Sequence, residues 1–417
     1  MSEWGGEKVG QLLLEEFEPS VEYIDIVHKN SKGWITKADI QNGYRQWHYK
    51  YKELINLDFN KENIYISLNT FYSTFRRLEY IKELQANFID IDCYNSKYSK
   101  EAVLYFLEND LYGYKIPRPS LVVDSGRGLY LIWLIEAVPS KALPLWKAVQ
   151  EYLYKELKRF GADRMALDAT RVLRVVGSVN SKTGTRVQIL DKYDYIYKLR
   201  EIQSEYLPEL EPNRPKKKGR PSKVVFVHRE RSLYYARIQD ITKLCELRDY
   251  DVKGQRELIL FLYRYYLCSF YDDADKALND VLELNSQFTK PLTINEVIKA
   301  TGSAEKVYFR KDKQYKYKNE TLIDLLGITE EEETYMTTII SDREYKRRRS
   351  LRDEKRYKDK LKAEGKLSKK EELEQIRSKI KSLREEGFKN KDISKALSLP
   401  TKTLERHITY MRKNGLL

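Results

Sequence analysis

The sequence predicts a mixed α+β protein with an N-terminal domain of strands and helices, an all-helical middle domain and a small helical C-terminal domain. Three observations support this prediction. Strand-like and helix-like segments alternate between about residues 63 and 190. The residues from 230 to about 340 have the character of helices, and the last forty carry apolar residues at helical spacing. The expected parts are 1–205, a basic proline-rich linker at 206–224, the helical domain at 225–340, a charged basic helix at 341–384 and the C-terminal domain at 385–417.

The overall composition is that of a folded protein with a polyanionic partner. The chain has 417 residues, of which 41% are hydrophobic, and 77 Lys and Arg against 63 Asp and Glu give a net charge of +14. A strong positive balance favours nucleic acid as the partner. The alternative is a Lys-rich and Tyr-rich composition inherited from an AT-rich genome.

The cysteines and the N-terminus favour a cytoplasmic protein. Cys93, Cys245 and Cys268 are isolated and have no C-x-x-C spacing, which argues against a disulfide framework or a zinc ribbon. The N-terminus lacks the basic and apolar regions of a signal peptide, and the longest apolar run, 129–135, is too short to span a bilayer. We therefore expect no membrane partner.

The N-terminal domain is read from the following segments. Strands are expected at "NIYISLNTFY" (63–72), "FIDID" (88–92), "RVLRVV" (171–176) and "RVQIL" (186–190). An amphipathic helix begins after Ser99, and a second runs from 143 to a stop at Gly161. "SLVVDSGRGLYLIWLI" (120–135) is expected to form a hairpin with a glycine-rich turn.

Two carboxylates inside the apolar strand "FIDID" predict a metal site. Asp90 and Asp92 lie two residues apart, so in a strand they share one face at about 6.6 Å. At that separation two unit charges repel by roughly 2.5 kcal/mol when the effective dielectric is near 20. With no His or paired Cys nearby, Mg²⁺ or Mn²⁺ is expected rather than Zn²⁺. The alternative is a solvated strand edge.

Two further segments carry polar groups suited to phosphates. The turn of the expected hairpin contains Ser125, Gly126, Arg127 and Gly128, whose exposed amides can meet an anion. "LDATRVLRVVGSVNSK" supplies an acid and several bases, namely Asp168, Arg171, Arg174 and Lys182. Either arginine could instead pair structurally with the aspartates.

The rest of the chain contains three candidate DNA-binding segments. "KKKGRPSK" within the linker looks like an AT-hook, although a solvated basic hinge is an equal alternative. Residues 341–373 hold 14 basic and 8 acidic residues and can be a solvated helix or a phosphate-contacting one. The apolar pattern after 376 predicts a helix-turn-helix whose last helix, 401–413, presents Thr401, Lys402, Thr403 and Arg406 to the major groove. The alternative is a small helical interaction domain.

Taken together, "FIDID", "SGRGLYLIW" and "LDATRVLRVVGSVNSK" resemble the motifs of the archaeo-eukaryotic primase superfamily, specifically the primase-type replication proteins of plasmids and mobile elements. The resemblance covers roughly residues 55–200 and implies a primase-like α/β domain with an RRM-like catalytic sheet. It also implies a nucleotidyltransferase in which Asp90, Asp92 and Asp168 bind two Mg²⁺ or Mn²⁺ ions. Ser125 and its neighbouring glycines would lie beside the nucleoside triphosphate, with Arg171, Arg174 and Lys182 as candidates for phosphate contacts. The second motif of the superfamily commonly ends in a histidine, and here the matching residue is Tyr130.

We therefore expect a replication protein that synthesises primers on a single-stranded DNA template and binds duplex origin DNA through its C-terminal domain. A separate helicase would have to unwind the duplex, because the sequence has no G-x-x-x-x-G-K-S/T motif. One alternative is a non-catalytic replication initiator with a degenerate primase fold. A transcription regulator would explain only the last forty residues.

Overall fold

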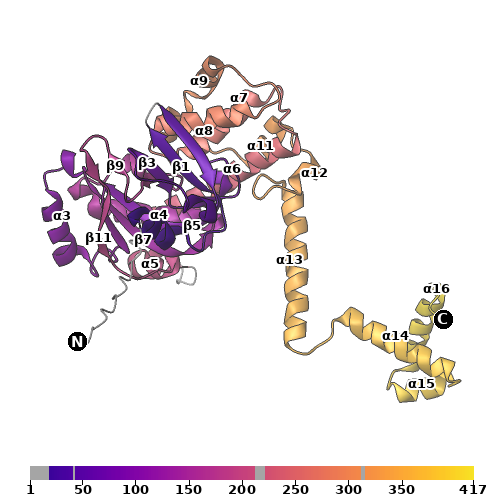
Figure 1. Ribbon diagram of the computed structural model, residues 1–417. Helices are drawn as coiled ribbons and strands as arrows, with labels where there is room; N and C mark the ends of the chain where they lie inside the picture. Colours follow the sequence, from indigo (N-terminus) through magenta and orange to yellow (C-terminus); the bar gives the residue numbers. More distant parts are fainter. Residues whose placement is uncertain (1–17, 41–42, 212–220, 311–314) are drawn as a thin grey trace, which may run out of the picture. The chain divides into compact units, whose positions relative to one another are not determined.

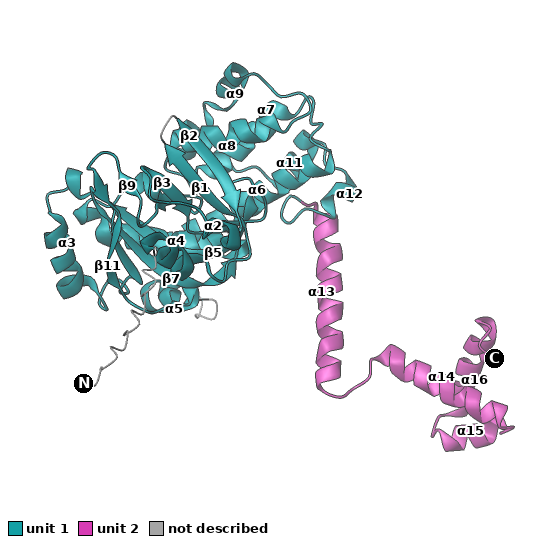
Figure 2. Ribbon diagram, viewed as in Figure 1, with its two compact units in different colours: residues 1–339 teal, residues 340–417 magenta. Residues whose placement is uncertain are grey.

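The structure is a computed structural model that describes residues 18–40, 43–211, 221–310 and 315–417. It confirms a mixed α+β protein. The chain divides into two compact units, residues 1–339 and 340–417 (Figures 1 and 2). The boundaries expected near residues 205 and 225 both fall inside unit 1. Part of the expected linker, including Lys216 to Arg220 of the AT-hook-like sequence, lies at 212–220, outside the described residues.

In its described residues, unit 1 contains two main antiparallel sheets. The first has the order β2-β1-β3-β8 and the second the order β11-β6-β7-β5-β4. The strands of the first sheet are β1 (Ile35–Ile40), β2 (Tyr44–Tyr49), β3 (Ile64–Ser67) and β8 (Val172–Arg174). Those of the second are β4 (Thr70–Phe71), β5 (Ile81–Ile91), β6 (Leu121–Asp124), β7 (Leu129–Pro139) and β11 (Gln188–Lys192). A short hairpin, β9 (Val179–Asn180) with β10 (Thr185–Arg186), stands beside them.

The first sheet is larger than the sequence pattern indicated. The segment 63–72, expected as one strand, is divided between β3 in the first sheet and β4 in the second. Asn69 lies at this division, and its Oδ1 accepts a hydrogen bond from the backbone N of Gln85 at 2.9 Å. The chain therefore passes from the first sheet to the second at Asn69, whose buried side chain takes the place of a strand partner for Gln85.

The second sheet has a dry core and a covered edge. Ile89, Ile91 and Leu131 are fully buried. Beyond the short β4, the edge of β5 is covered by helix α4 (Leu143–Leu157). The side chain of Gln150 binds both the backbone N and O of Phe88, at 3.2 Å from the N, so it replaces an absent strand.

Other helices surround the sheets of unit 1. They are α1 (Pro19–His28), α2 (Tyr51–Leu54), α3 (Lys100–Phe106) and α5 (Leu199–Tyr206). Helix α3 begins where Ser99 Oγ accepts a hydrogen bond from the N of Ala102 at 3.3 Å, as expected of an N-cap residue.

The helical part of unit 1 packs on its α/β part. It comprises α6 (Lys223–Leu247), α7 (Arg256–Leu267), α8 (Ala274–Ser286), α9 (Ile294–Thr301), α10 (Ala304–Phe309), α11 (Asn319–Leu326) and α12 (Glu330–Glu333). Arg231 of α6 pairs with Glu151 of α4. The Tyr263 hydroxyl of α7 donates to Glu79 Oε1 at 2.8 Å, and Glu79 also pairs with the buried Arg77 at 3.3 Å. These buried polar contacts join the two parts into one unit.

Unit 2 consists of helices. Helix α13 (Asp342–Ala363) is exposed along nearly all of its length, with Glu344 as its buried residue. Helices α14 (Lys369–Glu385), α15 (Asn390–Ala396) and α16 (Thr401–Lys413) enclose a small core made of Ile380, Ile393, Leu404, Ile408 and Met411. Gly387, at φ +88°, lets the chain turn between α14 and α15.

Candidate active site

A cavity of about 360 Å³ lies at the end of β5 in unit 1. Its wall comes from β5, the β6–β7 turn, β7, the segment after α4, β8 and the β9–β10 turn. The residues that line it are Asp90, Asp92, Ser125, Arg127, Gly128, Tyr130, Gly161, Asp163, Arg174 and Lys182. The structure thus gathers eight of the residues predicted from the sequence and adds Gly161 and Asp163.

Backbone pairing places Asp163 opposite Asp90. Ile91 and Ala162 form an antiparallel bridge, and the N of Asp163 donates to the O of Asp90 at 2.7 Å. Directly opposite residues of an antiparallel pair project to the same face, so both carboxylates point to one side. Gly161, at φ +92°, ends the helical turn after α4 and lets the chain reach this position.

The negative charges of Asp163 and Asp92 disfavour the ionised form of the buried Asp90. The pKa of Asp90 is raised to about 7, first by burial and then by the charge of Asp163, with Asp92 adding to the effect and Arg171 opposing it. Asp92 also caps the short helical turn that follows β5, because its Oδ1 accepts a hydrogen bond from the N of Tyr94 at 3.2 Å. A bound cation would offset the repulsion and favour the ionised form of Asp90.

The turn between β6 and β7 is held rigidly beside these acids. Ser125 Oγ donates to the O of Gly128 at 3.1 Å. Lys100 from α3 donates through Nζ to Asp124 Oδ1 at 2.6 Å and to the O of Gly126 at 2.7 Å. The backbone of the turn is therefore fixed from outside the cavity.

Two glycines of this turn are required by close contacts. A Cβ on Gly128 would lie 2.0 Å from the backbone O of Ile91, so the turn packs directly on the strand that carries the acids. Gly126 has a φ of +96°, and a Cβ on it would meet the Asn180 Nδ2 at 2.8 Å. Gly126 therefore shapes the turn without being among the residues that line the cavity.

Arg127 and Lys182 bring positive charge to the cavity. The Arg127 guanidinium lies 4.2 Å from the centre of the Tyr94 ring, a cation–π contact that orients it. Lys182 follows β9, and its backbone N donates to Asn180 Oδ1 at 3.1 Å. Asn180 Nδ2 in turn donates to the O of Ser125 at 2.7 Å, which joins the two turns.

Tyr130 and Arg174 also line the cavity. Tyr130 pairs with Asp90 across β5 and β7 and is 3% exposed. Burial, with a contribution from Asp90, raises the pKa of Tyr130, so its hydroxyl stays neutral at physiological pH. Arg174 stacks at 5.0 Å on the Tyr65 ring, and its buried Nε has no hydrogen-bond partner among the described residues. An unpaired guanidinium nitrogen in a cavity wall suits an anionic ligand.

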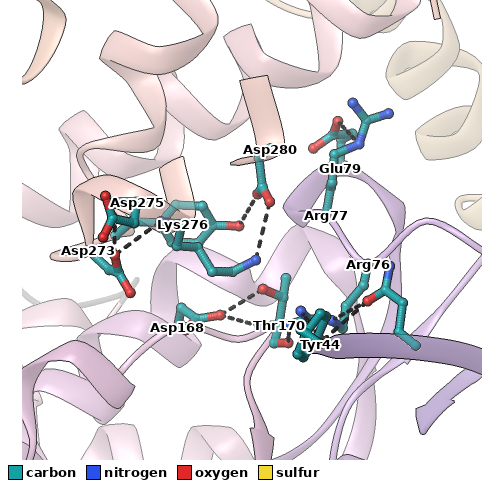
Figure 3. A network of polar contacts seen from close by, with 12 residues as sticks. Tyr44, Arg76, Arg77, Glu79, Asp168, Thr170, Asp273, Asp275, Lys276 and Asp280 are labelled. Atoms are coloured by element: carbon teal, nitrogen blue, oxygen red, sulfur yellow. Dashed lines mark hydrogen bonds and ion pairs between the residues drawn. The ribbon is translucent and has the colours of Figure 1, made fainter. Parts of the chain in front are cut away.

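Asp168, expected as the third metal ligand, does not line this cavity. Its Oδ1 accepts hydrogen bonds from Thr170 N at 3.0 Å and Thr170 Oγ1 at 2.7 Å, within the polar network of Figure 3. Burial raises the pKa of Asp168, but the charges of Lys276 and Arg171 outweigh burial and the pKa is lowered. The carboxylate is thus engaged inside the protein, and Asp163 is the further acid that lines the cavity.

Arg171 also stands outside the group of residues that line the cavity. Its Nη1 donates to the O of Met165 at 3.5 Å. Its charge opposes the rise in the pKa of Asp90 and contributes to the lowered pKa of Asp168. Arg171 therefore acts on the cavity through its charge in this structure.

The chemistry of the cavity suits a hard divalent cation. Asp90, Asp92 and Asp163 offer carboxylate oxygens, the ligands that Mg²⁺ and Mn²⁺ prefer. Among the described residues, no three His, Cys, Asp or Glu side chains are already gathered as a complete ligand set. Mg²⁺ usually takes one or two carboxylates together with substrate phosphates rather than an all-protein cage. The residues therefore fit an ion that binds together with a nucleotide.

In unit 2, the residues expected to contact duplex DNA lie on the exposed side of α16. Thr401, Lys402 and Arg406 are exposed, and Thr403 is half-buried. Lys402 and Arg406 border a surface hollow together with Glu405, Thr409, Tyr410 and Lys413. The buried Leu404 and Ile408 fix the opposite side of the helix in the core.

Sequence reasoning missed Asp163 because its position depends on a bridge of very few residues. "GADRM" has no alternating pattern, and a two-residue pairing with β5 leaves no trace in hydrophobicity. The available signal was Gly161 at the end of a helix, two residues before an acid that itself lies five residues ahead of the expected Asp168.

The comparisons with known proteins identify one curated relative. The sequence matches no family model. A replication protein from Clostridium perfringens is 66% identical over 396 residues, which cover 95% of this chain and 97% of the relative. No helix in the described residues is long and apolar enough to cross a membrane.

Two solved structures show weaker likeness. The AEP domain of the cyanophage S-2L primase-polymerase is 16% identical, with a TM-score of 0.34, and the match covers 45% of this chain and 95% of that domain. Primase RepB′ is 13% identical, with a TM-score of 0.31, and the match covers 68% of this chain and 98% of that structure. TM-scores at this level do not establish a shared fold, so the family assignment rests on the curated relative. High identity over almost the full length of both sequences shows that this chain belongs to the same family of replication proteins.

Proposed function

We propose that this replication protein is a nucleotidyltransferase of the primase or primase-polymerase type, which joins nucleotides on a single-stranded DNA template. The observation that carries the proposal is the composition of one cavity. It combines three carboxylates, Asp90, Asp92 and Asp163, with the cations Arg174 and Lys182. Carboxylates that hold divalent ions, next to fixed positive charge, are the groups that phosphoryl transfer requires.

The residues of the cavity have separate roles in this proposal. Nucleotidyl transfer joins a 3′-hydroxyl oxygen to the α-phosphorus of a nucleoside triphosphate and releases pyrophosphate. Arg174 and Lys182 hold the phosphates, because each brings positive charge and the buried Nε of Arg174 is unpaired. The neutral Tyr130 hydroxyl and the Ser125 side chain can orient the nucleotide by hydrogen bonding.

Asp90, Asp92 and Asp163 would hold Mg²⁺ or Mn²⁺. When bound, such ions polarise the 3′-hydroxyl and neutralise charge that develops on the phosphates. The raised pKa of Asp90 is consistent with this role, because burial and the charges of Asp163 and Asp92 outweigh those of Arg171 and Arg174.

The C-terminal helices would bind duplex DNA as a helix-turn-helix. The N-terminal part of α16 presents Lys402 and Arg406 to solvent while its other side is buried in the core. In helix-turn-helix proteins this part of the second helix enters the major groove. A replication origin is the expected duplex, and a plasmid or other mobile element is the expected replicon.

A non-catalytic initiator is the second candidate, and Tyr130 is the observation that favours it. Related primases commonly have a histidine at this motif position, and a tyrosine with a raised pKa carries no positive charge there. In that case the cavity would bind nucleotides or DNA without joining them.

Primer synthesis on a single-stranded template tests the proposal. Labelled nucleotides would be supplied with Mg²⁺ or Mn²⁺ to the wild type, to the Asp90→Ala, Asp92→Ala double variant and to Asp110→Ala, an exposed residue outside the cavity. We expect product from the wild type and from Asp110→Ala but not from the double variant. A folded wild-type protein that binds DNA but makes no product with either ion would support the initiator instead.

A further inference from the structure

The cavity continues onto one face of the first sheet. Arg174, which lines the cavity, pairs with Tyr65 of β3, Tyr65 pairs with Ala38 of β1, and Ala38 pairs with Gln46 of β2. Residues paired in this way project to the same face, so they form a row across four strands. With strands about 4.8 Å apart, the row extends roughly 14 Å from the cavity to the edge of the sheet.

The outer end of this face is aromatic and accessible. Tyr44 lies two residues before Gln46 in β2, so it is on the same face, and it is 50% exposed. Tyr65 is partly exposed next to Arg174. Ala38 is small and fully buried between these groups, so aromatic and amide side chains provide the accessible surface.

Arg76 lies across the same face and binds groups at both ends of it. Its Nη1 donates to the O of Thr170 at 2.6 Å, its Nε to Gln46 Oε1 at 3.2 Å and its Nη2 to the Tyr44 hydroxyl at 2.7 Å. Figure 3 shows Arg76, Tyr44 and Thr170 together in this network. Arg76 therefore fixes Tyr44 at the edge of the sheet in relation to the segment that carries Arg171 and Arg174.

The face is positively charged. Among the described residues, neither Arg76 nor Arg174 forms an ion pair with a carboxylate. Their contacts are to carbonyl, amide and phenol groups or to rings. Guanidinium groups next to accessible aromatic rings, here the exposed Tyr44 and the partly exposed Tyr65, are the pattern that binds unstacked bases and the phosphate backbone of a single strand. A duplex offers no free base faces to such rings.

We propose that this face, which we name the β2 track and define by Tyr44, Gln46, Tyr65, Arg76 and Arg174, binds the single-stranded template as it leads to the cavity. Tyr44 stacks on a base at the edge of the sheet, and the arginines bind the phosphates. The proposal rests on the proposed function, since it identifies the partner of the same site. Tyr44 does not line the cavity, so a substitution of Tyr44 leaves the residues of the proposed reaction in place.

The opposite face of β2 provides a matched control. Trp47, which pairs with Lys37, alternates with Tyr44 and Gln46 and points to the other side of the sheet. It is 37% exposed, and Lys37 Nζ lies 4.9 Å from the centre of its ring. Trp47 is thus an aromatic residue next to a cation on the same strand but outside the β2 track.

The experiment uses the full chain and a labelled single-stranded oligonucleotide without nucleotide or divalent ion. The affinity for this oligonucleotide is compared among the wild type, Tyr44→Ala, Tyr44→Phe and Trp47→Ala. Excess unlabelled duplex is present throughout, so that the proposed duplex-binding side of unit 2 would be occupied. Loss of a stacked base is expected to weaken single-strand binding by about tenfold in Tyr44→Ala. Tyr44→Phe keeps the ring and Trp47→Ala leaves the track intact, so both should bind like the wild type. Equal weakening in Tyr44→Phe would contradict stacking, because that variant keeps the ring and loses only the hydrogen bonds of the hydroxyl with Arg76 and Gln46.

Photocrosslinking locates the strand independently of affinity. Oligonucleotides that carry 5-iodouracil react on irradiation with aromatic side chains in contact, and mass spectrometry identifies the peptide. Crosslinks to Tyr44 or Tyr65 are expected. Crosslinks that map to Trp47 or only to residues 340–417 would overturn the β2 track. Neither readout depends on synthesis, so an inactive protein that crosslinks at Tyr44 would refute the proposed function and leave the β2 track standing.

Discussion

At the scale of single residues, charge and burial divide the acids of unit 1 into two groups. Asp90, Asp92 and Asp163 face one cavity, where their charges add. Asp168 lies among cations and hydrogen-bond donors that satisfy it, including Lys276 from α8. Acids gathered around one cavity point to an ion-binding role, and an acid held by cations and donors inside the protein points to a structural one.

The raised pKa of Asp90 makes a prediction about stability and pH. Its pKa is about 7 in the folded protein against an ordinary value of 3.8, so between these values the folded state binds more protons than the unfolded state. Stability therefore falls as pH rises through this window. Asp90→Asn removes the cost, so its Tm in EDTA should exceed that of the wild type by more at pH 8 than at pH 5. A difference that does not grow with pH would contradict the assignment of charge to this cavity.

Asp168→Asn should affect folding more than chemistry. The substitution keeps the shape of the side chain but removes the charge that faces Lys276 and Arg171. We expect a loss of stability on the order of 1–3 kcal/mol in urea denaturation, with synthesis retained by the fraction that remains folded. An Asp168→Asn protein of wild-type stability that makes no product would show instead that this carboxylate takes part in catalysis.

At the scale of elements, sequence pattern predicts the long and periodic segments and misses the short ones. The hairpin expected at 120–135 is β6 and β7, and the helix expected from 143 is α4, because apolar residues repeat along each of them. The bridge between Ile91 and Ala162 has no such repeat, and only Gly161 at the end of the preceding helix marks the segment that carries Asp163. The β1–β2 hairpin was missed as well, although Thr36, Ala38 and Ile35 are buried in it.

The exposed side of α16 makes a prediction about salt dependence. Lys402 and Arg406 are exposed on the first two turns of the helix, and each phosphate contact that is lost reduces the slope of log affinity against log salt by about 0.9. Lys402→Ala with Arg406→Ala should weaken duplex binding and flatten that slope by roughly 1 to 2. Glu405→Ala, on the same exposed side, is the control and should not flatten the slope. An unchanged slope in the double variant would place the duplex elsewhere.

At the scale of the whole molecule, the two units have separate cores and separate candidate functions. Unit 1 contains an α/β part, which carries the cavity, and a helical part that packs on this α/β part. Unit 2 has its own small core. The sequence predicted distinct boundaries near 205 and 225, but it could not show that buried pairs such as Tyr263 with Glu79 join the helical part to the α/β part. Contacts between residues 184 positions apart leave no local pattern.

Removal of residues 340–417 should separate the two functions. Unit 1 keeps its core and cavity, so templated synthesis on single-stranded DNA should persist, whereas sequence-selective duplex binding should be lost. The measurements are a gel-shift assay on origin duplex and nucleotide incorporation on a single-stranded template. Loss of both activities from a protein with wild-type secondary structure would contradict the division between the units.

The most direct test of the central claim is the initial rate of nucleotide incorporation by Asp163→Asn. Asp163 is the one acid of the cavity that the structure added, through its position opposite Asp90. Asn preserves the shape of the side chain and its capacity to accept the hydrogen bond from the N of Met165, which the carboxylate accepts at 2.9 Å. If the cavity is the site of nucleotidyl transfer, the variant should fold normally and lose at least about a hundredfold in rate with Mg²⁺, on the order of 3 kcal/mol of transition-state stabilisation. A folded Asp163→Asn protein that incorporates nucleotides at the wild-type rate would contradict the claim.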